Sequence, residues 1–148
     1  MENSQINFRI HGIEIISLSL NQRPDEGFEG TAYNFAYAVE NKIEPDKNLI
    51  VSFVKVDITE LDKSVILGNI IVACGIEVPN LINVLPRDAE NLPTIPQELD
   101  LVIRAVAIST TRGIMFSEFK GTYLHNAIFP VVMQAIPFQS QQPAVATP

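Results

Sequence analysis

The chain has 148 residues, of which 47 % are hydrophobic and 18 % charged. This apolar content is enough to build one hydrophobic core, so a chain that is disordered throughout is excluded. The net charge is −7, which argues against nucleic acid as a partner because phosphate binding needs a basic surface. One cysteine and two histidines exclude a disulfide framework and disfavour a dense metal site.

Neither a targeting signal nor a membrane span is predicted. Residues 1–5 lack the basic and apolar regions of a signal peptide. The longest apolar stretch, 65–76, is interrupted by two glycines and an asparagine and is too short to cross a bilayer. We therefore expect a cytoplasmic protein without membrane insertion, in which Cys74 is an inert, reduced core thiol.

Four segments alternate in polarity with a period of two, which predicts β-strands. They cover residues 6–20, with a bulge or bend at Gly12, and about 31–41, 49–59 and 65–78. Short polar turns join the last three segments, which favours an antiparallel meander.

A proline-rich connection at 79–96 precedes a change of period. Apolar residues then recur at intervals of three and four, which predicts a helix, and they are Leu99, Val102, Ile103, Val106 and Ala107. Thr94 with Gln97 fits a capping box at the helix start, and Gly113 or Gly121 is expected to end it.

These elements predict an α+β fold: a four-stranded antiparallel sheet with one long helix after a proline-rich crossing. The expected organisation is a single domain over residues 1–138 and a flexible polar tail over 139–148.

The predicted strand at 65–78 is apolar on both faces, and the predicted helix is apolar beyond one stripe. One helix cannot cover both faces of a four-stranded sheet, so this excess points to burial against another copy of the chain. The residues expected at that oligomer interface are Val102, Ala105, Val106 and Ile108.

Signals for catalysis are missing from the sequence. It contains no Walker loop, dinucleotide fingerprint or nucleophile elbow. The acidic turn at 57–62 has no glycine and lacks the ligand spacing of a calcium loop. His11 and His125 are interpreted as structural or solvent-facing. We therefore expect no enzymatic activity, no catalytic residue, no metal and no cofactor.

An aromatic row, Tyr33, Phe35 and Tyr37, follows one face of the second predicted strand. It is either a strand face in the core or a partly exposed adhesive surface. Phe28 lies in an acidic loop with no evident core to enter, and it leads into this row. The residues expected to bind peptide are therefore Phe28, Tyr33, Phe35 and Tyr37, and nearby acids would attract basic clients.

The order of these elements resembles the SecB-type protein-export chaperone family over about residues 6–132. The resemblance is clearest at Ala73-Cys74-Gly75-Ile76-Glu77-Val78, where the fourth strand ends. It continues in the helix around Ser109-Thr110-Thr111-Arg112-Gly113-Ile114-Met115-Phe116, and in the segment from Gly121-Thr122-Tyr123-Leu124 to Pro130-Val131-Val132.

The resemblance implies dimers whose sheets join edge to edge, and a tetramer formed as a dimer of dimers with the helices between two sheets. It also implies ATP-independent holding of unfolded or partly folded polypeptides along apolar grooves. The acidic net charge suits clients that are basic and contain aromatic residues.

The sequence departs from the family pattern in two places. Family members that dock onto the translocase motor SecA carry acids shortly before a proline. With Pro24 as that proline, these positions hold Leu18 and Gln22, which makes motor docking doubtful. The segment 133–138 contains a proline and leads into a polar tail, so a long second helix, and the deep client groove that it would line, are not expected.

Three functions compete on this basis. The first is a holdase chaperone, acting in protein export or guarding an unstable partner such as an antitoxin. The second is an oligomeric structural or assembly protein on the same fold that holds no clients. The third is an enzyme or small-ligand binder with a pocket between sheet and helix, for which the sequence offers no cluster of polar groups.

Overall fold

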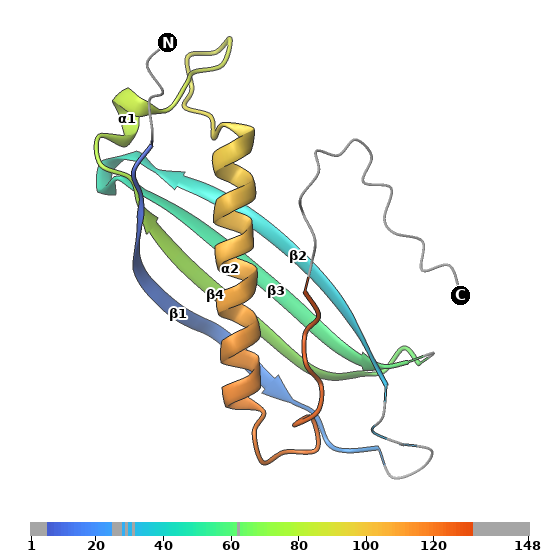
Figure 1. Ribbon diagram of the computed structural model, residues 1–148. Helices are drawn as coiled ribbons and strands as arrows, with labels where there is room; N and C mark the ends of the chain where they lie inside the picture. The colour runs from blue at the N-terminus through green and yellow to red at the C-terminus, as the bar shows by residue number, and fades with distance from the viewer. Residues whose placement is uncertain (1–5, 25–27, 29, 31, 62, 132–148) are drawn as a thin grey trace.

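The computed structural model describes residues 6–24, 28, 30, 32–61 and 63–131. Its strands are β1 (Arg9–Leu20), β2 (Tyr33–Glu44), β3 (Leu49–Glu60) and β4 (Ile66–Glu77), and its helices are α1 (Leu81–Val84) and α2 (Gln97–Glu118). The strands form one antiparallel sheet in the order β1-β4-β3-β2, and α2 crosses one face of it (Figure 1). The predicted α+β fold with a β2-β3-β4 meander is confirmed.

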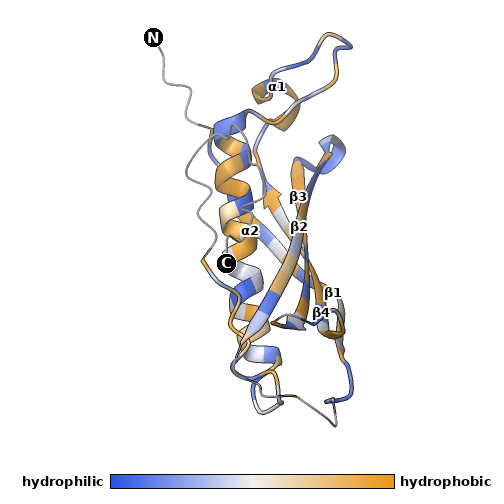
Figure 2. Cartoon of the chain, turned by 90° about the vertical axis from the view of Figure 1, so that its right-hand side faces the viewer, coloured by the Kyte–Doolittle hydropathy of each residue, from blue (hydrophilic) through white to orange (hydrophobic). Residues whose placement is uncertain are grey.

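The hydrophobic core lies between α2 and the central strands β3 and β4. Along β3, alternate side chains are fully buried, as the period of two predicts. Figure 2 shows α2 against one face of the sheet only, and no described helix covers the opposite face. The core-facing residues of the two strands include Ile50, Val54, Val56, Ile58, Ile70, Val72, Cys74 and Ile76.

β1 pairs with β4 at one edge of the sheet and is exposed along its whole length. Two bulges interrupt the pairing, one at His11 next to Gly12 and one at Ile16, so the bulge expected near Gly12 is confirmed. Between and beyond the bulges, five apolar residues lie opposite core-facing residues of β4 and form what we call the β1 apolar face. They are Ile10, Ile13, Ile15, Leu18 and Leu20, each about 39–48 % exposed because α2 packs on β3 and β4 instead.

The start and end of α2 differ in part from the sequence prediction. Pro96 is the residue at the helix start, and no side chain caps it. The capping box at Thr94 is wrong, because the Thr94 hydroxyl donates to the Pro86 carbonyl in the preceding connection at 3.2 Å. The helix also passes through Gly113, and the chain turns at Gly121, which has a left-handed φ of 82°.

The buried side of α2 is rotated from the predicted stripe. Val102, which belongs to the predicted stripe and was also expected at the oligomer interface, is 44 % exposed, whereas Ile108, expected at the same interface, is 3 % exposed in the subunit's own core. The helix continues for 22 residues, and its buried side follows the sheet through Thr111 to Met115. In the described part of the chain, no helix has the length and apolarity to cross a membrane.

After α2 the chain turns back and runs between α2 and β2 as far as residue 131 (Figure 1). Its apolar side chains Leu124, Ala127 and Phe129 are buried and close that flank of the core. The polar tail at 139–148 and the segment 133–138 lie outside the described residues.

Gly68 provides a test of this packing. A methyl group added at Gly68 would lie 2.8 Å from Leu124 Cδ1 and 3.3 Å from the Ser19 carbonyl, both closer than normal contact. Because Leu124 is itself fully buried, we expect Gly68→Ala to lower the free energy of unfolding by about 1–3 kcal/mol.

Gly75 is the matched control on the same strand, because a methyl group there meets its nearest atom at 3.6 Å. Chemical denaturation of Gly68→Ala, Gly75→Ala and the parent measures the difference. Equal stabilities of the two variants would contradict the close packing of Leu124 over β4.

Candidate functional site

The odd-numbered residues of β2 face the same side of the sheet as α2. Tyr33 lies opposite Glu60, Phe35 opposite Ile58 and Tyr37 opposite Val56, as the unbroken register of β2 with β3 requires. One aromatic residue from the loop before β2 and two from the chain after α2 join them. We call the resulting set the aromatic strip, and its members are Phe28, Tyr33, Phe35, Tyr37, Tyr123 and Phe129.

Phe28 packs at one end of the aromatic strip. Its ring meets that of Tyr123 edge to face at a centroid distance of 5.4 Å and lies 6.5 Å from that of Tyr33. The Arg23 guanidinium lies over its other side at 5.2 Å. The expectation that Phe28 finds no core is therefore wrong, because Tyr123, 95 positions further along the chain, returns to meet it. The acidic neighbours at 25, 26 and 29 lie outside the described residues.

Hydrogen bonds anchor this end of the strip to the sheet. The Tyr123 hydroxyl donates to the Asn21 carbonyl at 2.6 Å, and the Leu67 carbonyl lies 3.1 Å away as a second, more distant acceptor for the same proton. The Tyr33 hydroxyl donates to the Tyr123 carbonyl at 3.3 Å. Burial raises the pKa of both phenols, with the Glu60 carboxylate adding to the effect on Tyr33. Both tyrosines therefore remain neutral hydrogen-bond donors at physiological pH.

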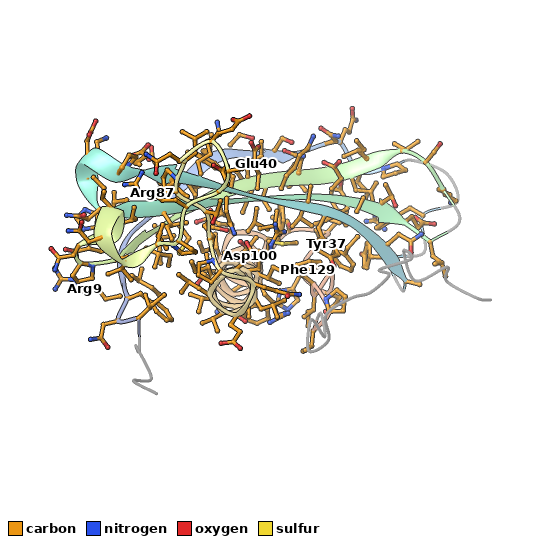
Figure 3. The ribbon with its side chains drawn as sticks, turned by 90° about the horizontal axis from the view of Figure 1, so that it is seen from above. Arg9, Tyr37, Glu40, Arg87, Asp100 and Phe129 are labelled. Carbon is orange, nitrogen blue, oxygen red and sulfur yellow. The ribbon has the colours of Figure 1, made fainter. Side chains whose placement is uncertain are left out.

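Phe129 fills the other end of the strip. It is 1 % exposed, and its ring centroid lies 5.6 Å from that of Phe35 and 5.4 Å from that of Tyr37. Figure 3 labels Tyr37 and Phe129 at this end of the strip. Arg112 of α2 donates to the carbonyls of Phe129 and Pro130, both at 2.8 Å, and stacks on the Phe129 ring. The returning segment is therefore held to α2 by main-chain contacts as well as by its buried ring.

The four residues expected to bind peptide are thus brought onto one strip, but they are not equally accessible. Phe28, Tyr33 and Phe35 are half-buried, and Tyr37 is 42 % exposed. Sequence analysis missed Tyr123, Phe129 and Arg112, which complete the strip. No short-range pattern marks these three, because their partners are distant in the sequence.

A polar bridge ties α2 to β2 beyond Tyr37. Asp100 accepts hydrogen bonds from the Asn41 amide and from Arg104, both at 2.7 Å. Arg104 also donates to the Val39 carbonyl at 3.2 Å. These contacts fix the N-terminal half of α2 against the strand that carries the strip.

Groups that could perform chemistry are dispersed in the described part of the chain. His11 lies 3.9 Å from a Glu77 carboxylate oxygen on β4, and His125 lies beside the Phe116 ring. Cys74 is buried, and burial raises the pKa of its thiol. Among the described residues, no three His, Cys, Asp or Glu side chains gather in a group that could hold a metal.

Two shallow hollows lie on the open face of the sheet, away from the aromatic strip. One, of about 340 Å³, is lined mainly by Ala38, Phe53, Lys55 and Ile71, and the other, of about 260 Å³, lies beside Gly12. Their charged side chains are Glu40, Lys42 and Lys55 in the first and His11 and Glu14 in the second, and all of these are exposed to solvent rather than enclosed as in a typical small-molecule site.

The residues expected at an oligomer interface fall on different sides of α2. Val102 and Ala105 are exposed on the side away from the sheet, and Val106 is half-buried. Ile108 faces the subunit's own core, so it is not available to contact a second copy. The assignment remains a prediction for Val102, Ala105 and Val106.

The comparisons with known proteins bear on the fold. Neither a family model nor a curated protein matches the sequence. Among solved structures, the chain is similar to a SecB-like chaperone of Mycobacterium tuberculosis, determined in complex with a peptide from an antitoxin. The two chains are 10 % identical with a TM-score of 0.55, and the match covers 85 % of this chain and 90 % of that one. The chain thus has a SecB-like fold, as the sequence resemblance implied.

Among the rings of the aromatic strip, we expect that of Phe129 to contribute most to the stability of the protein. We expect Phe129→Ala to lower the free energy of unfolding by about 3–5 kcal/mol, because the ring is buried between two others. Tyr37→Ala is the comparison and costs about 1 kcal/mol, since Tyr37 is 42 % exposed and its loss leaves no enclosed cavity. Urea denaturation measures both values, and equal losses would show that the ring of Phe129 is not the buried centre of the strip.

Proposed function

We propose that the protein is a holdase chaperone that binds unfolded or partly folded polypeptides along the aromatic strip without ATP. The observation that carries this proposal is that the strip follows β2 and yet remains partly accessible, most of all at Tyr37. Aromatic side chains provide a large contact area at low entropic cost, and their contacts tolerate varied sequences, as a holdase needs.

The structural neighbour supports the same function. That protein is a chaperone and was solved with a peptide from an antitoxin bound to it. By analogy, clients of the present chain are segments of unfolded polypeptide, either exported proteins or an unstable partner of the antitoxin kind. The net charge of −7 favours basic segments among them, and a cytoplasmic location fits either role.

Client holding is tested by the suppression of aggregation. A model protein is diluted from denaturant in the presence of the parent or of Tyr37→Ala, and light scattering follows its aggregation. We expect the variant to need several-fold more protein for the same suppression, with its melting temperature and oligomer mass nearly unchanged.

Val84→Ala is the matched control, because Val84 is an exposed apolar residue in α1 and lies outside the strip. Suppression by Tyr37→Ala equal to that by the parent and by Val84→Ala would remove the strip from the site. If the parent itself has no effect on aggregation, the alternative of an assembly protein without clients is the correct one.

We also propose that the chain assembles as a dimer of dimers. The β1 apolar face and the outward side of α2 are both exposed in the single subunit, and contiguous apolar surfaces are commonly covered by a partner. Edge-to-edge joining through β1 would bring the β1 apolar faces of two copies side by side in one sheet. Packing of a second such pair over them, with helices in contact between the two sheets, would cover these faces together with Val102 and Ala105.

Ala105→Glu tests this assembly. Its carboxylate would be buried without a partner between two helices, which costs several kcal/mol, whereas in the free subunit it meets water. We expect light scattering behind a sizing column to show a smaller particle with near-parent circular dichroism. A parent protein that is itself monomeric at micromolar concentration would contradict the proposal, as would a variant that stays fully assembled.

A further inference from the structure

The face of the sheet opposite α2 has an apolar centre that no described helix covers. Val51 and Phe53 of β3 and Ile71 and Ala73 of β4 point to this face, because the alternate residues of both strands are buried in the core. Phe53 lies opposite Ala73 in the register of the two strands, and Phe53 and Ile71 are only half-buried. A partly exposed apolar centre of this kind is typical of a surface that binds a partner.

The larger of the two hollows on this face, about 340 Å³ in volume, lies beside the apolar centre. Ala38 of β2, Phe53 and Ile71 give it an apolar floor, and the small, exposed Ala38 leaves space next to its larger neighbours. Figure 3 shows Glu40, two residues further along β2, on the side of the sheet away from Phe129, so the hollow and the aromatic strip lie on opposite faces. The hollow can therefore take a large apolar side chain of a partner while the strip stays free.

Two lysines stand at this hollow, Lys42 of β2 and Lys55 of β3, and both are exposed. The Lys42 ammonium lies 5.5 Å from the centroid of the Phe53 ring, so its charge is held over the apolar floor. Within the described part of the chain neither lysine forms an ion pair, whereas Arg9 and Arg104 each pair with a carboxylate. In a chain whose net charge is −7, two unpaired cations beside one apolar hollow form a local positive site.

Acidic groups on this face do not cancel the local positive charge. Among the described residues, Glu40 is the one carboxylate that lines the hollow. Asp57, on the same face of β3, accepts a hydrogen bond from the Asn69 amide. The second hollow, beside Gly12, is lined by Glu14 and by no lysine. An apolar floor with an excess of positive charge is therefore a property of the first hollow and not of the whole face.

We propose that this hollow docks an acidic segment of a partner protein, in which a large apolar side chain is flanked by carboxylates. The apolar side chain occupies the floor at Ala38, Phe53 and Ile71, and the carboxylates pair with Lys42 and Lys55. This surface is separate from the aromatic strip and selects the opposite charge, because the strip favours basic clients. It would let the protein bind a partner while it holds a client.

An acidic protein segment fits the hollow better than other occupants. A second copy of the chain carries a net charge of −7 spread over its surface and would present the same two lysines, so like charges would meet across the contact. Nucleic acid needs a basic surface wider than two lysines. A basic client segment is repelled by Lys42 and Lys55, whereas carboxylates beside an apolar side chain complement both the charge and the floor.

Peptide binding to the full-length protein tests the proposal. The probe is a labelled peptide in which a leucine is flanked on both sides by glutamates, and the control peptide has glutamines in their place. We expect fluorescence anisotropy to show the acidic peptide binding about tenfold more tightly than the control, with an affinity that falls as salt is added. Amide chemical shifts should change at Phe53, Lys55 and Ile71 and stay constant at Tyr123 and Phe129.

Single charge changes isolate the electrostatic part of the docking. We expect Lys55→Gln to lower the affinity for the acidic peptide about threefold and Glu40→Gln to raise it by about the same factor. Lys120→Gln is the matched control, because Lys120 is an exposed lysine just after α2 and its loss changes the net charge equally. Equal affinities of Lys55→Gln and Lys120→Gln would overturn the inference.

A steric pair tests the apolar floor without changing charge. Ala38→Trp fills the hollow, whereas Ala36→Trp adds the same ring at an exposed position of the same face that does not line it. Strands accept aromatic residues, and circular dichroism checks that both variants fold. We expect Ala38→Trp to bind the acidic peptide about tenfold more weakly than Ala36→Trp, and equal binding would contradict docking at the hollow.

The outcomes separate this inference from the proposed function. If the acidic peptide shifts the amides of the aromatic strip, or no longer binds to Tyr37→Ala, docking at the hollow is wrong while client holding stands. If Ala38→Trp reduces the mass of the assembled protein, the face is an interface between copies and the inference is again wrong. An acidic peptide that does not bind at about 1 mM also overturns it. Unchanged client holding by Lys55→Gln supports two independent surfaces.

Discussion

The contact between α2 and one face of β3 and β4 is the constraint on which the rest of the molecule depends. A single helix is narrower than four strands, so burying the two central strands leaves both flanks of the sheet uncovered on that face. On the β2 flank the chain returns and supplies Tyr123 and Phe129. On the β1 flank nothing in the described residues does so, and five apolar side chains remain in water. The difference between the covered β2 flank and the exposed β1 flank is therefore a consequence of how α2 packs on the two central strands.

Sequence patterns predicted the strands and the long helix well, because the residues that determine each of these elements are close together in the sequence. The period of two located all four strands to within a few residues, and the change of period located α2. The helix start was wrong because Thr94 finds a competing acceptor in the proline-rich connection. Ile108 was expected at an oligomer interface and instead lies in the core, because apolar residues surround much of α2 and hydropathy alone does not determine which side faces the sheet.

The candidate site was predicted only in part, since its residues depend on contacts between distant parts of the chain. The row of Tyr33, Phe35 and Tyr37 follows from the alternation in β2, and the structure places it on the α2 side. The partners of that row come from about 90 positions later and are fixed by Arg112, whose hydrogen bonds go to main-chain carbonyls. Main-chain acceptors leave no signature in a sequence, so neither the return of the chain nor the shelter that it gives to Phe28 was foreseen.

The two edge strands differ in how they tolerate the deletion of one residue, because β1 has bulges and β2 has none. Each bulge holds one residue more than β4 requires, so a single deletion nearby removes the bulge and leaves the apolar side chains facing as before. β2 has no such spare residue, because its pairing with β3 is continuous. A deletion within β2 moves every side chain on one side of the gap to the opposite face, and the aromatic rings with them. Insertions and deletions should therefore accumulate in β1 over evolutionary time and be rare in β2.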